Sequence, residues 1–206
     1  MQPFPTLALE SQVLLAARIT GEGSLSMPDG STYQGELLNG RYNGRGILTY
    51  ADGTKYDGDF RNGKYDGNGI LAYADGSRYE GQFKGGNYDG PGLLTLRDGT
   101  KYQGDFAAGQ YNGKGLLMLP DGTRYEGGFL AGQYDGKGLL ALPDGTRYEG
   151  GFLAGLYEGK GVLNLPDGSS YTGNFVKGNF DGIGVYTMSN GARIVATFKN
   201  GKYSAR

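Results

Sequence analysis

The chain of 206 residues repeats itself every 23 residues, and this period constrains the fold more than any other feature. The segment that begins at Arg124 begins again, almost letter for letter, at Arg147. One tyrosine in each copy marks the period without an insertion or deletion: Tyr33, Tyr56, Tyr79, Tyr102, Tyr125, Tyr148 and Tyr171. A period of this length is typical of a repeat array, in which each copy is one supersecondary unit that stacks on the next.

The array predicts one repeat domain over residues 21–206, preceded by a cap at residues 1–20. Counting back one period places Leu14 at the position of Leu37. This favours a degenerate first repeat, a capping strand, over the short helix that the propensities of residues 7–19 would also allow. The last copy, which starts at Ile194, is also degenerate, as expected of a terminal repeat that has no neighbour on its outer side.

Each copy contains a hairpin signal between two short apolar stretches. The signal is Pro-Asp-Gly at residues 28–30, 120–122, 143–145 and 166–168, and Ala-Asp-Gly at 51–53 and 74–76. Proline or alanine starts a type I turn, aspartate suits the second corner, and glycine takes the left-handed position that follows. The sequence therefore predicts three-residue hairpin loops between short antiparallel strands.

The loop at 143–145 sets a register in which Leu140 faces Tyr148 and Gly138 faces Gly150. Alternate residues of a strand share a face, so the repeated Tyr, Phe, Leu and Gly positions all fall on one side of the sheet, the aromatic face. Large rings lie there among glycines, and a ring can pack on glycine backbone. The opposite side, the ladder face, carries alternating charges and a row of Ile, Leu and Val.

Composition argues against several classes of function. The net charge is −1 with acids and bases interspersed, so no nucleic-acid partner is expected. The chain has no histidine and no cysteine, which removes the commonest general base and the usual transition-metal ligands. Most repeated aspartates precede a turn glycine. We therefore expect no enzyme activity, no cofactor and no metal site. A cytoplasmic location is expected because no apolar run is long enough to span a membrane and the start lacks a basic region.

The repeat resembles the MORN repeat (membrane occupation and recognition nexus) over about residues 21–203. The motif Tyr-x-Gly-x-Phe, with glycines at fixed spacing and a following Asp-Gly, occurs in seven clear copies. Phe, or Leu37 in the first copy, stands where the family often has Trp. The resemblance implies an all-β fold, an elongated single-layer antiparallel sheet of stacked 23-residue β-hairpins with an open solenoid-like groove. It also implies a scaffold or adaptor that binds a protein or, as an alternative, phospholipid.

The aromatic face is the predicted binding surface, since a single-layer sheet is expected to leave it partly exposed and exposed apolar rows mark interaction sites. The expected ligand is an extended peptide or an amphipathic helix of a protein partner. The residues predicted to bind it are Tyr79, Phe83, Tyr102, Phe106, Tyr125, Phe129, Tyr148 and Phe152. The competing interpretation is that these rings only hold the hairpins together.

Two alternatives use the ladder face. An apolar ladder could bind the partner or a second copy of the chain in a homodimer: Leu116, Leu130, Leu139, Leu153, Val162 and Val176. A basic row could bind anionic phospholipid, although a neutral or acidic residue follows each of its members two positions on: Lys55, Arg78, Lys101, Arg124 and Arg147.

Overall fold

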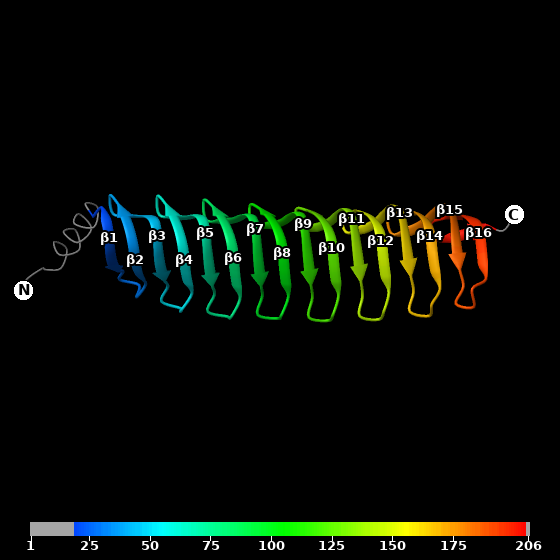
Figure 1. Ribbon diagram of the computed structural model, residues 1–206, viewed down its shortest axis with the longest axis horizontal. Helices are drawn as coiled ribbons and strands as arrows, with labels where there is room; N and C mark the ends of the chain where they lie inside the picture. Colours follow the sequence, from blue (N-terminus) through cyan, green and yellow to red (C-terminus); the bar gives the residue numbers. More distant parts are fainter. Residues whose placement is uncertain (1–18, 205–206) are drawn as a thin grey trace, which may run out of the picture. The chain divides into compact units, whose positions relative to one another are not determined.

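The computed structural model describes residues 19–204, and the prediction of an all-β fold is confirmed for them. They form seventeen β-strands and no helix within that range. The chain divides into two compact units, residues 1–97 and 98–206. Each unit is an open antiparallel sheet in which consecutive strands pair (Figure 1). The cap predicted at residues 1–20 lies almost entirely outside the described residues. Over the described range, no helix is long and apolar enough to cross a membrane.

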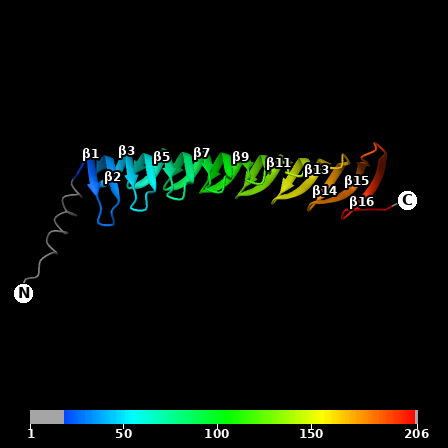
Figure 2. The ribbon, with the colours of Figure 1, turned by 90° about the horizontal axis from the view of Figure 1, so that it is seen from below.

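The first unit contains seven strands, which lie side by side in chain order in both Figure 1 and Figure 2. Their bounds are β1 Gly21–Ser26, β2 Thr32–Leu38, β3 Arg41–Thr49, β4 Lys55–Arg61, β5 Lys64–Ala72, β6 Arg78–Lys84 and β7 Asn87–Thr95.

The second unit contains ten strands and repeats the same alternation of a seven-residue and a nine-residue strand. Their bounds are β8 Lys101–Ala107, β9 Gln110–Met118, β10 Arg124–Leu130, β11 Gln133–Ala141, β12 Arg147–Leu153, β13 Leu156–Asn164, β14 Ser170–Val176, β15 Asn179–Thr187, β16 Arg193–Lys199 and β17 Lys202–Ser204.

The predicted hairpin loop and its register are confirmed between β11 and β12. Leu140 pairs with Tyr148 and Gly138 with Gly150. Gly145 has a φ of +94°, the left-handed value that the turn requires. The Asp144 carboxylate accepts a hydrogen bond from the N–H of Thr146 at 2.8 Å, which also lowers the pKa of the Asp144 carboxyl. The repeated aspartates therefore hold the loops in shape.

A second kind of turn joins the strands at their other ends, opposite the three-residue loops (Figure 1). It has two residues, and both have positive φ, as in a type I′ turn. At residues 131 and 132 these values are +48° for Ala131 and +81° for Gly132, and at residue 62 the value is +51° for Asn62. Asparagine tolerates this region better than alanine does, because its side chain can bond to the local backbone.

We expect Ala131→Asn to raise the free energy of unfolding by about 0.5–1 kcal/mol, because it relieves left-handed strain in an exposed turn. The reciprocal variant Asn62→Ala should lower it by a similar amount at the equivalent position. Urea denaturation followed by circular dichroism measures both. A loss of stability in Ala131→Asn would contradict this account of the turn.

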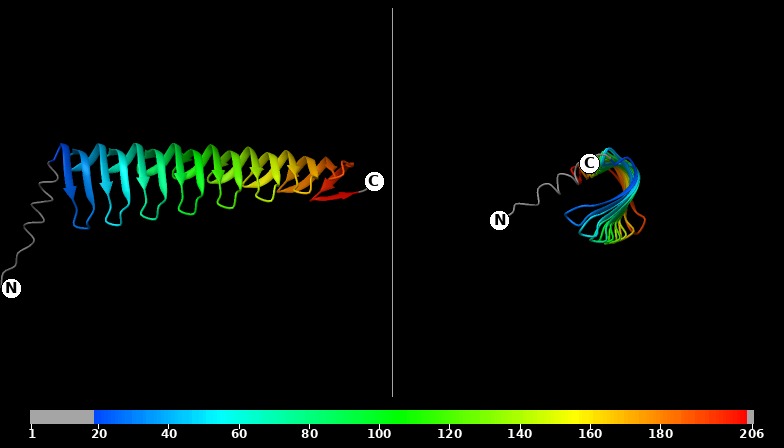
Figure 3. Two further views of the ribbon diagram at one scale, coloured as in Figure 1. Left: turned by 60° about the horizontal axis from the view of Figure 1, so that its bottom comes forward. Right: turned by 90° about the vertical axis from the view of Figure 1, so that its left-hand side faces the viewer.

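The right-hand view of Figure 3 looks along the row of strands and shows that the strands are curved rather than straight. β10 contains a β-bulge between Gly127 and Phe129, and a bulge bends the strand that contains it. The buried Tyr125 hydroxyl donates a hydrogen bond to the carbonyl oxygen of Gly128 at 2.9 Å and so fixes the bulge. The equivalent tyrosine and carbonyl make this bond in the other copies, for example Tyr56 with Asp59 at 2.8 Å.

The core of each unit is built from three aromatic rows. The first tyrosine row comprises the repeat-marking residues Tyr33, Tyr56, Tyr79, Tyr102, Tyr125, Tyr148 and Tyr171, all at most 1% exposed. The second row covers the first and comprises Tyr42, Tyr65, Tyr88, Tyr111, Tyr134, Tyr157 and Phe180. The phenylalanine row contacts both and comprises Phe60, Phe83, Phe106, Phe129, Phe152, Phe175 and Phe198, with Leu37 in the first copy.

One copy shows how the rows pack. The ring of Tyr125 stacks on Tyr134 with a centroid distance of 3.7 Å. Its edges meet Phe129 at 5.1 Å and Phe152 of the next copy at 5.0 Å. The ring also lies against Gly138, where a Cβ atom would be 2.5 Å from the Tyr125 hydroxyl oxygen. The prediction that rings pack on glycine backbone is thus confirmed.

Candidate binding groove

The eight aromatic residues predicted to bind a partner are buried, so the prediction that they form an exposed surface is wrong. Tyr79, Tyr102, Tyr125 and Tyr148 are 0% exposed, and Phe83, Phe106, Phe129 and Phe152 are 3–4% exposed. The reason is the second row, whose rings cover the first row although the sheet has only one layer. A partner cannot touch these eight rings unless the second row moves.

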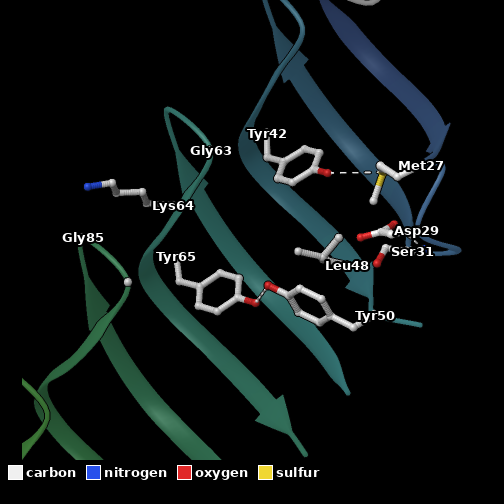
Figure 4. Close-up of a pocket in the computed structure, with 11 residues that line it drawn as sticks. Met27, Asp29, Ser31, Tyr42, Leu48, Tyr50, Gly63, Lys64, Tyr65 and Gly85 are labelled. Carbon is white, nitrogen blue, oxygen red and sulfur yellow. Dashed lines mark hydrogen bonds between the residues drawn. The ribbon is translucent and has the colours of Figure 1, made fainter. Parts of the chain in front are cut away.

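An open hollow of about 440 Å³ lies on the aromatic face of the first unit (Figure 4). Its floor includes the buried Leu48. Its other side chains come from β3, β5 and the loops beside them, and backbone at Gly63, Gly85 and Gly86 completes the rim: Met27, Asp29, Ser31, Tyr42, Tyr50, Lys64 and Tyr65. We call this hollow, together with the adjoining Tyr73 and Tyr88, the tyrosine groove.

Paired tyrosines distinguish the tyrosine groove from the rest of the aromatic face. The hydroxyl oxygens of Tyr50 and Tyr65 are 2.6 Å apart, and those of Tyr73 and Tyr88 are also 2.6 Å apart. Tyr50 and Tyr73 remain 38% exposed. Each exposed ring is therefore held in place by a hydrogen bond while its face stays open to a ligand.

The first copy has a methionine where the next two have these exposed tyrosines. The Tyr42 hydroxyl donates to the sulfur of Met27 at 3.5 Å (Figure 4). Methionine and tyrosine both suit adaptable contact with apolar side chains. The groove thus presents apolar and aromatic side chains in register, with Asp29 and Lys64 at its border.

Burial raises the pKa of the tyrosines of the first and second rows. The pKa of Tyr125 rises to about 12, first because of burial and then because of the nearby Tyr134 and Asp135. The pKa of Tyr65 also rises, because of burial and because of its hydrogen bond with Tyr50. These phenols are neutral at physiological pH and can donate hydrogen bonds, which suits binding better than general-base chemistry.

We expect alkaline unfolding between about pH 10 and pH 12. The folded-state pKa of Tyr125 lies above the value of about 10 for an unfolded chain, so its contribution to stability is complete below pH 10 and is lost as the pH rises through 12. Tyr79, Tyr102 and Tyr148 have the same pKa and add to the effect. Tyrosinate absorbance and circular dichroism should change together. Full ionisation near pH 10 with an intact fold would contradict this burial, and the same titration in urea is the control.

The position of Tyr50 and Tyr73 becomes leucine in the later copies, first at Leu96 in the same unit. Leucine occupies it at Leu119, Leu142 and Leu165, and all three are half-buried. Burial and the turn aspartate of the preceding loop raise the pKa of Tyr111, Tyr134 and Tyr157. This change from tyrosine to leucine is visible in the sequence, and it is the signal that could have located the groove.

The apolar ladder is the more exposed of the two predicted surfaces in the second unit. Leu130 is 59% exposed, Leu153 57% and Val176 38%, whereas Leu116, Leu139 and Val162 are half-buried. Self-association through this ladder remains a prediction.

The basic row lies on the ladder face, and two of its five members pair with an acid on their own strand. The Arg78 guanidinium is 2.7 Å from the Glu80 carboxylate, and that of Arg124 is 2.6 Å from Glu126. Lys55, Lys101 and Arg147 are exposed. Since part of its charge is neutralised, the row gives the lipid alternative no support.

Metal and cofactor sites were not expected from the sequence. Within residues 19–204, no group of three or more acidic, histidine or cysteine side chains is placed to hold a metal ion.

Comparison with solved structures finds distant similarity. The TCP domain of SAS-4 (dCPAP) from Drosophila melanogaster, solved in complex with a proline-rich motif of Ana2 (dSTIL), is 13% identical, with 96% of this chain and 97% of that chain covered and a TM-score of 0.45. The TCP10 domain of Danio rerio CPAP is 17% identical, with 89% and 85% covered and a TM-score of 0.45.

Comparison with curated protein sequences finds no significant match. The MORN repeat profile, in contrast, matches seven consecutive segments: residues 33–55, 56–78, 79–101, 102–124, 125–147, 148–170 and 171–193. These segments cover most of the chain and start at the tyrosines of the first row. The chain therefore belongs to the MORN repeat family.

Proposed function

We propose that this protein is a non-enzymatic scaffold that binds a segment of a protein partner in the tyrosine groove of its first unit. The observation that carries the proposal is that two exposed tyrosines, Tyr50 and Tyr73, stand beside an open hollow. Each is held by a hydrogen bond to another tyrosine, Tyr50 to Tyr65 and Tyr73 to Tyr88. Tyrosine is enriched among the residues that dominate protein interfaces, because it offers a large rigid surface and a polar tip.

The groove favours an extended peptide or an amphipathic helix with apolar anchors. Tyr50 and Tyr73 lie at the same position of successive repeats, two strands apart. At about 4.8 Å per strand they are spaced by roughly 10 Å, close to two turns of an α-helix, which span about 11 Å. The hydrogen bonds to Tyr65 and Tyr88 restrict both rings before binding, so little side-chain entropy is lost.

The test uses peptides selected from a random phage-displayed library on the full chain. We expect a selected peptide to bind Tyr50→Ala/Tyr73→Ala at least about tenfold more weakly, since each truncated tyrosine anchor costs on the order of 1–2 kcal/mol. Fluorescence anisotropy with the labelled peptide measures the affinity, after circular dichroism has shown that the variant is folded.

The matched control is Leu130→Ser/Leu153→Ser, which changes two exposed residues of the apolar ladder. Its affinity for the peptide should equal that of the wild type. Weakened binding in this control together with normal binding in the tyrosine variant would move the site to the ladder face. Binding of vesicles that contain phosphatidylserine, lost in Lys55→Gln/Lys101→Gln, would instead favour the lipid alternative.

A further inference from the structure

In the first unit, an acidic side chain fills the ladder face at the β-bulge. The Asp59 carboxylate accepts a hydrogen bond from the N–H of Asn68 at 2.9 Å and lies over Gly67. Glu36 does the same one repeat earlier, where it accepts the N–H of Arg45 at 3.2 Å. The chain itself therefore shows which chemical group fits this position.

In the third copy a neutral side chain also places an oxygen over the equivalent glycine. Gln82 occupies the position, and its carboxamide oxygen lies over Gly90. The next residue is Pro91, which has no N–H to donate. The fourth copy returns to an acid, Asp105, whose carboxylate lies over Gly113.

In the two copies that follow, this position has no side chain: it is Gly128 in the copy that starts at Tyr125 and Gly151 in the copy that starts at Tyr148. A Cβ atom at Gly151 would collide with the backbone oxygen of Glu158, so glycine is required by the local backbone. The space over Gly159, the equivalent of Gly67, is open, with no heavy atom within 4 Å of an ideal Cβ position. Among the hydrogen bonds of the described residues, no side chain accepts the N–H of Lys160.

The result is a hollow of about 860 Å³ on the ladder face of β11, β12 and β13. Lys137 pairs with Gly151 across the strands, as Arg45 pairs with Asp59 in the first unit, and Lys160 follows Gly159. Neither lysine takes part in an ion pair within the part of the chain that the structure describes.

The remaining residues that line the hollow determine which other groups of a ligand can bind beside its charged group. Leu139 and Val162 supply apolar surface. Two acids also line the hollow, Glu149 and Glu158. The Glu158 carboxylate already accepts the N–H of Lys177 at 2.9 Å. Neither acid takes part in an ion pair within the described residues either, so an added carboxylate is favoured by the open space over Gly159 and by the carboxylates that fill the equivalent space in other copies.

We propose that this hollow binds a carboxylate from an acidic side chain of a protein segment, in the place that the Asp59 carboxylate takes in its own repeat. The carboxylate would lie over Gly159, accept the N–H of Lys160 and pair with the ammonium groups of Lys137 and Lys160. Such charge-assisted hydrogen bonds are stronger than neutral ones. The site is formed by β11, β12 and β13 of the second unit and does not depend on the function proposed for the first unit.

The test is a nuclear magnetic resonance titration of the ¹⁵N-labelled full chain. The probes are sodium acetate and the tripeptide acetyl-Leu-Glu-Leu-amide, with sodium chloride at matched ionic strength as the reference. We expect a saturable shift of the Lys160 amide signal. The Arg45 and Asn68 amides should not shift, since carboxylates of the chain already occupy them. The peptide with Gln in place of Glu should bind at least about tenfold more weakly, equivalent to about 1.4 kcal/mol.

Two variants sharpen the result. Lys137→Gln/Lys160→Gln should abolish the saturable shift while leaving the spectrum of the first unit unchanged. Asp59→Ala should open the equivalent position, so that the Asn68 amide now responds to acetate. The proposal is overturned if chloride reproduces the shift, if the lysine variant responds as the wild type does, or if inorganic phosphate binds more tightly than the tripeptide.

Discussion

Replacing Tyr125 with alanine is expected to lower the free energy of unfolding by about 3–5 kcal/mol, the range for removing a fully buried aromatic ring. Tyr125 is 0% exposed, and its ring contacts Tyr134, Phe129 and Phe152. Removal leaves a cavity that rings held by neighbouring repeats cannot fill. The loss is a large fraction of the roughly 5–15 kcal/mol that stabilise an ordinary domain.

A graded series separates the ring from its hydroxyl. Tyr125→Phe keeps the ring but removes the hydrogen bond to the Gly128 carbonyl, so it should cost only about 1 kcal/mol. Leu130→Ser, at a side chain that is 59% exposed, should change stability by less than about 0.5 kcal/mol. Urea denaturation of the three variants gives the comparison. Equal effects of Tyr125→Ala and Leu130→Ser would show that the first row is not the core.

Gly138→Ala is expected to destabilise the fold by about 3 kcal/mol, although it adds only one methyl group. The new Cβ atom would be 2.5 Å from the Tyr125 hydroxyl oxygen and 2.6 Å from the ring. The Tyr125 ring cannot move away from the new methyl group, because the ring of Tyr134 stacks on it with a centroid distance of 3.7 Å. The substitution therefore forces the ring or the strand to move.

A double-mutant cycle isolates this contact. In the Tyr125→Ala background, Gly138→Ala should cost less than about 1 kcal/mol, because the clashing ring is gone. The coupling between the two positions should then be about 2 kcal/mol, within the range for residues in direct contact. An additive cycle would mean that the glycine is needed for its backbone alone.

The strand register could be predicted from the sequence because it depends on a local feature. The loop at residues 143–145 has a defined length and a glycine that takes a left-handed conformation, and these two properties place Leu140 opposite Tyr148. The strict period then carries the same register to every copy. The packing of rings on glycine followed from the same alternation along the strands.

Burial of the aromatic face could not be predicted in the same way. A flat single-layer sheet would leave Tyr125 partly exposed. In the structure, the strands bend at the bulge near Gly128, and Tyr134 stacks on Tyr125. The alternation of residues along the strands encodes neither the bulge nor this stacking. The accessible surface consequently moves to side chains beside the loops.

The two proposed sites depend on differences between copies rather than on the consensus. Tyr50 and Tyr73 occupy a position that is leucine in four later copies. Gly151 stands where Glu36 and Asp59 carry acids. Each difference is visible in the sequence, but its meaning depends on the hydroxyl pairs and on the open hollow, which only the structure shows.

Site-specific photo-crosslinking is the most direct test of the tyrosine groove. Benzoylphenylalanine is placed at Tyr50 in the groove or at the exposed Gln34 on the opposite face of the same sheet, and each protein is irradiated with the peptide selected on the wild type. The account predicts a covalent peptide adduct at position 50 and none at position 34. An adduct at position 34 alone, or equal yields at both positions, would contradict it.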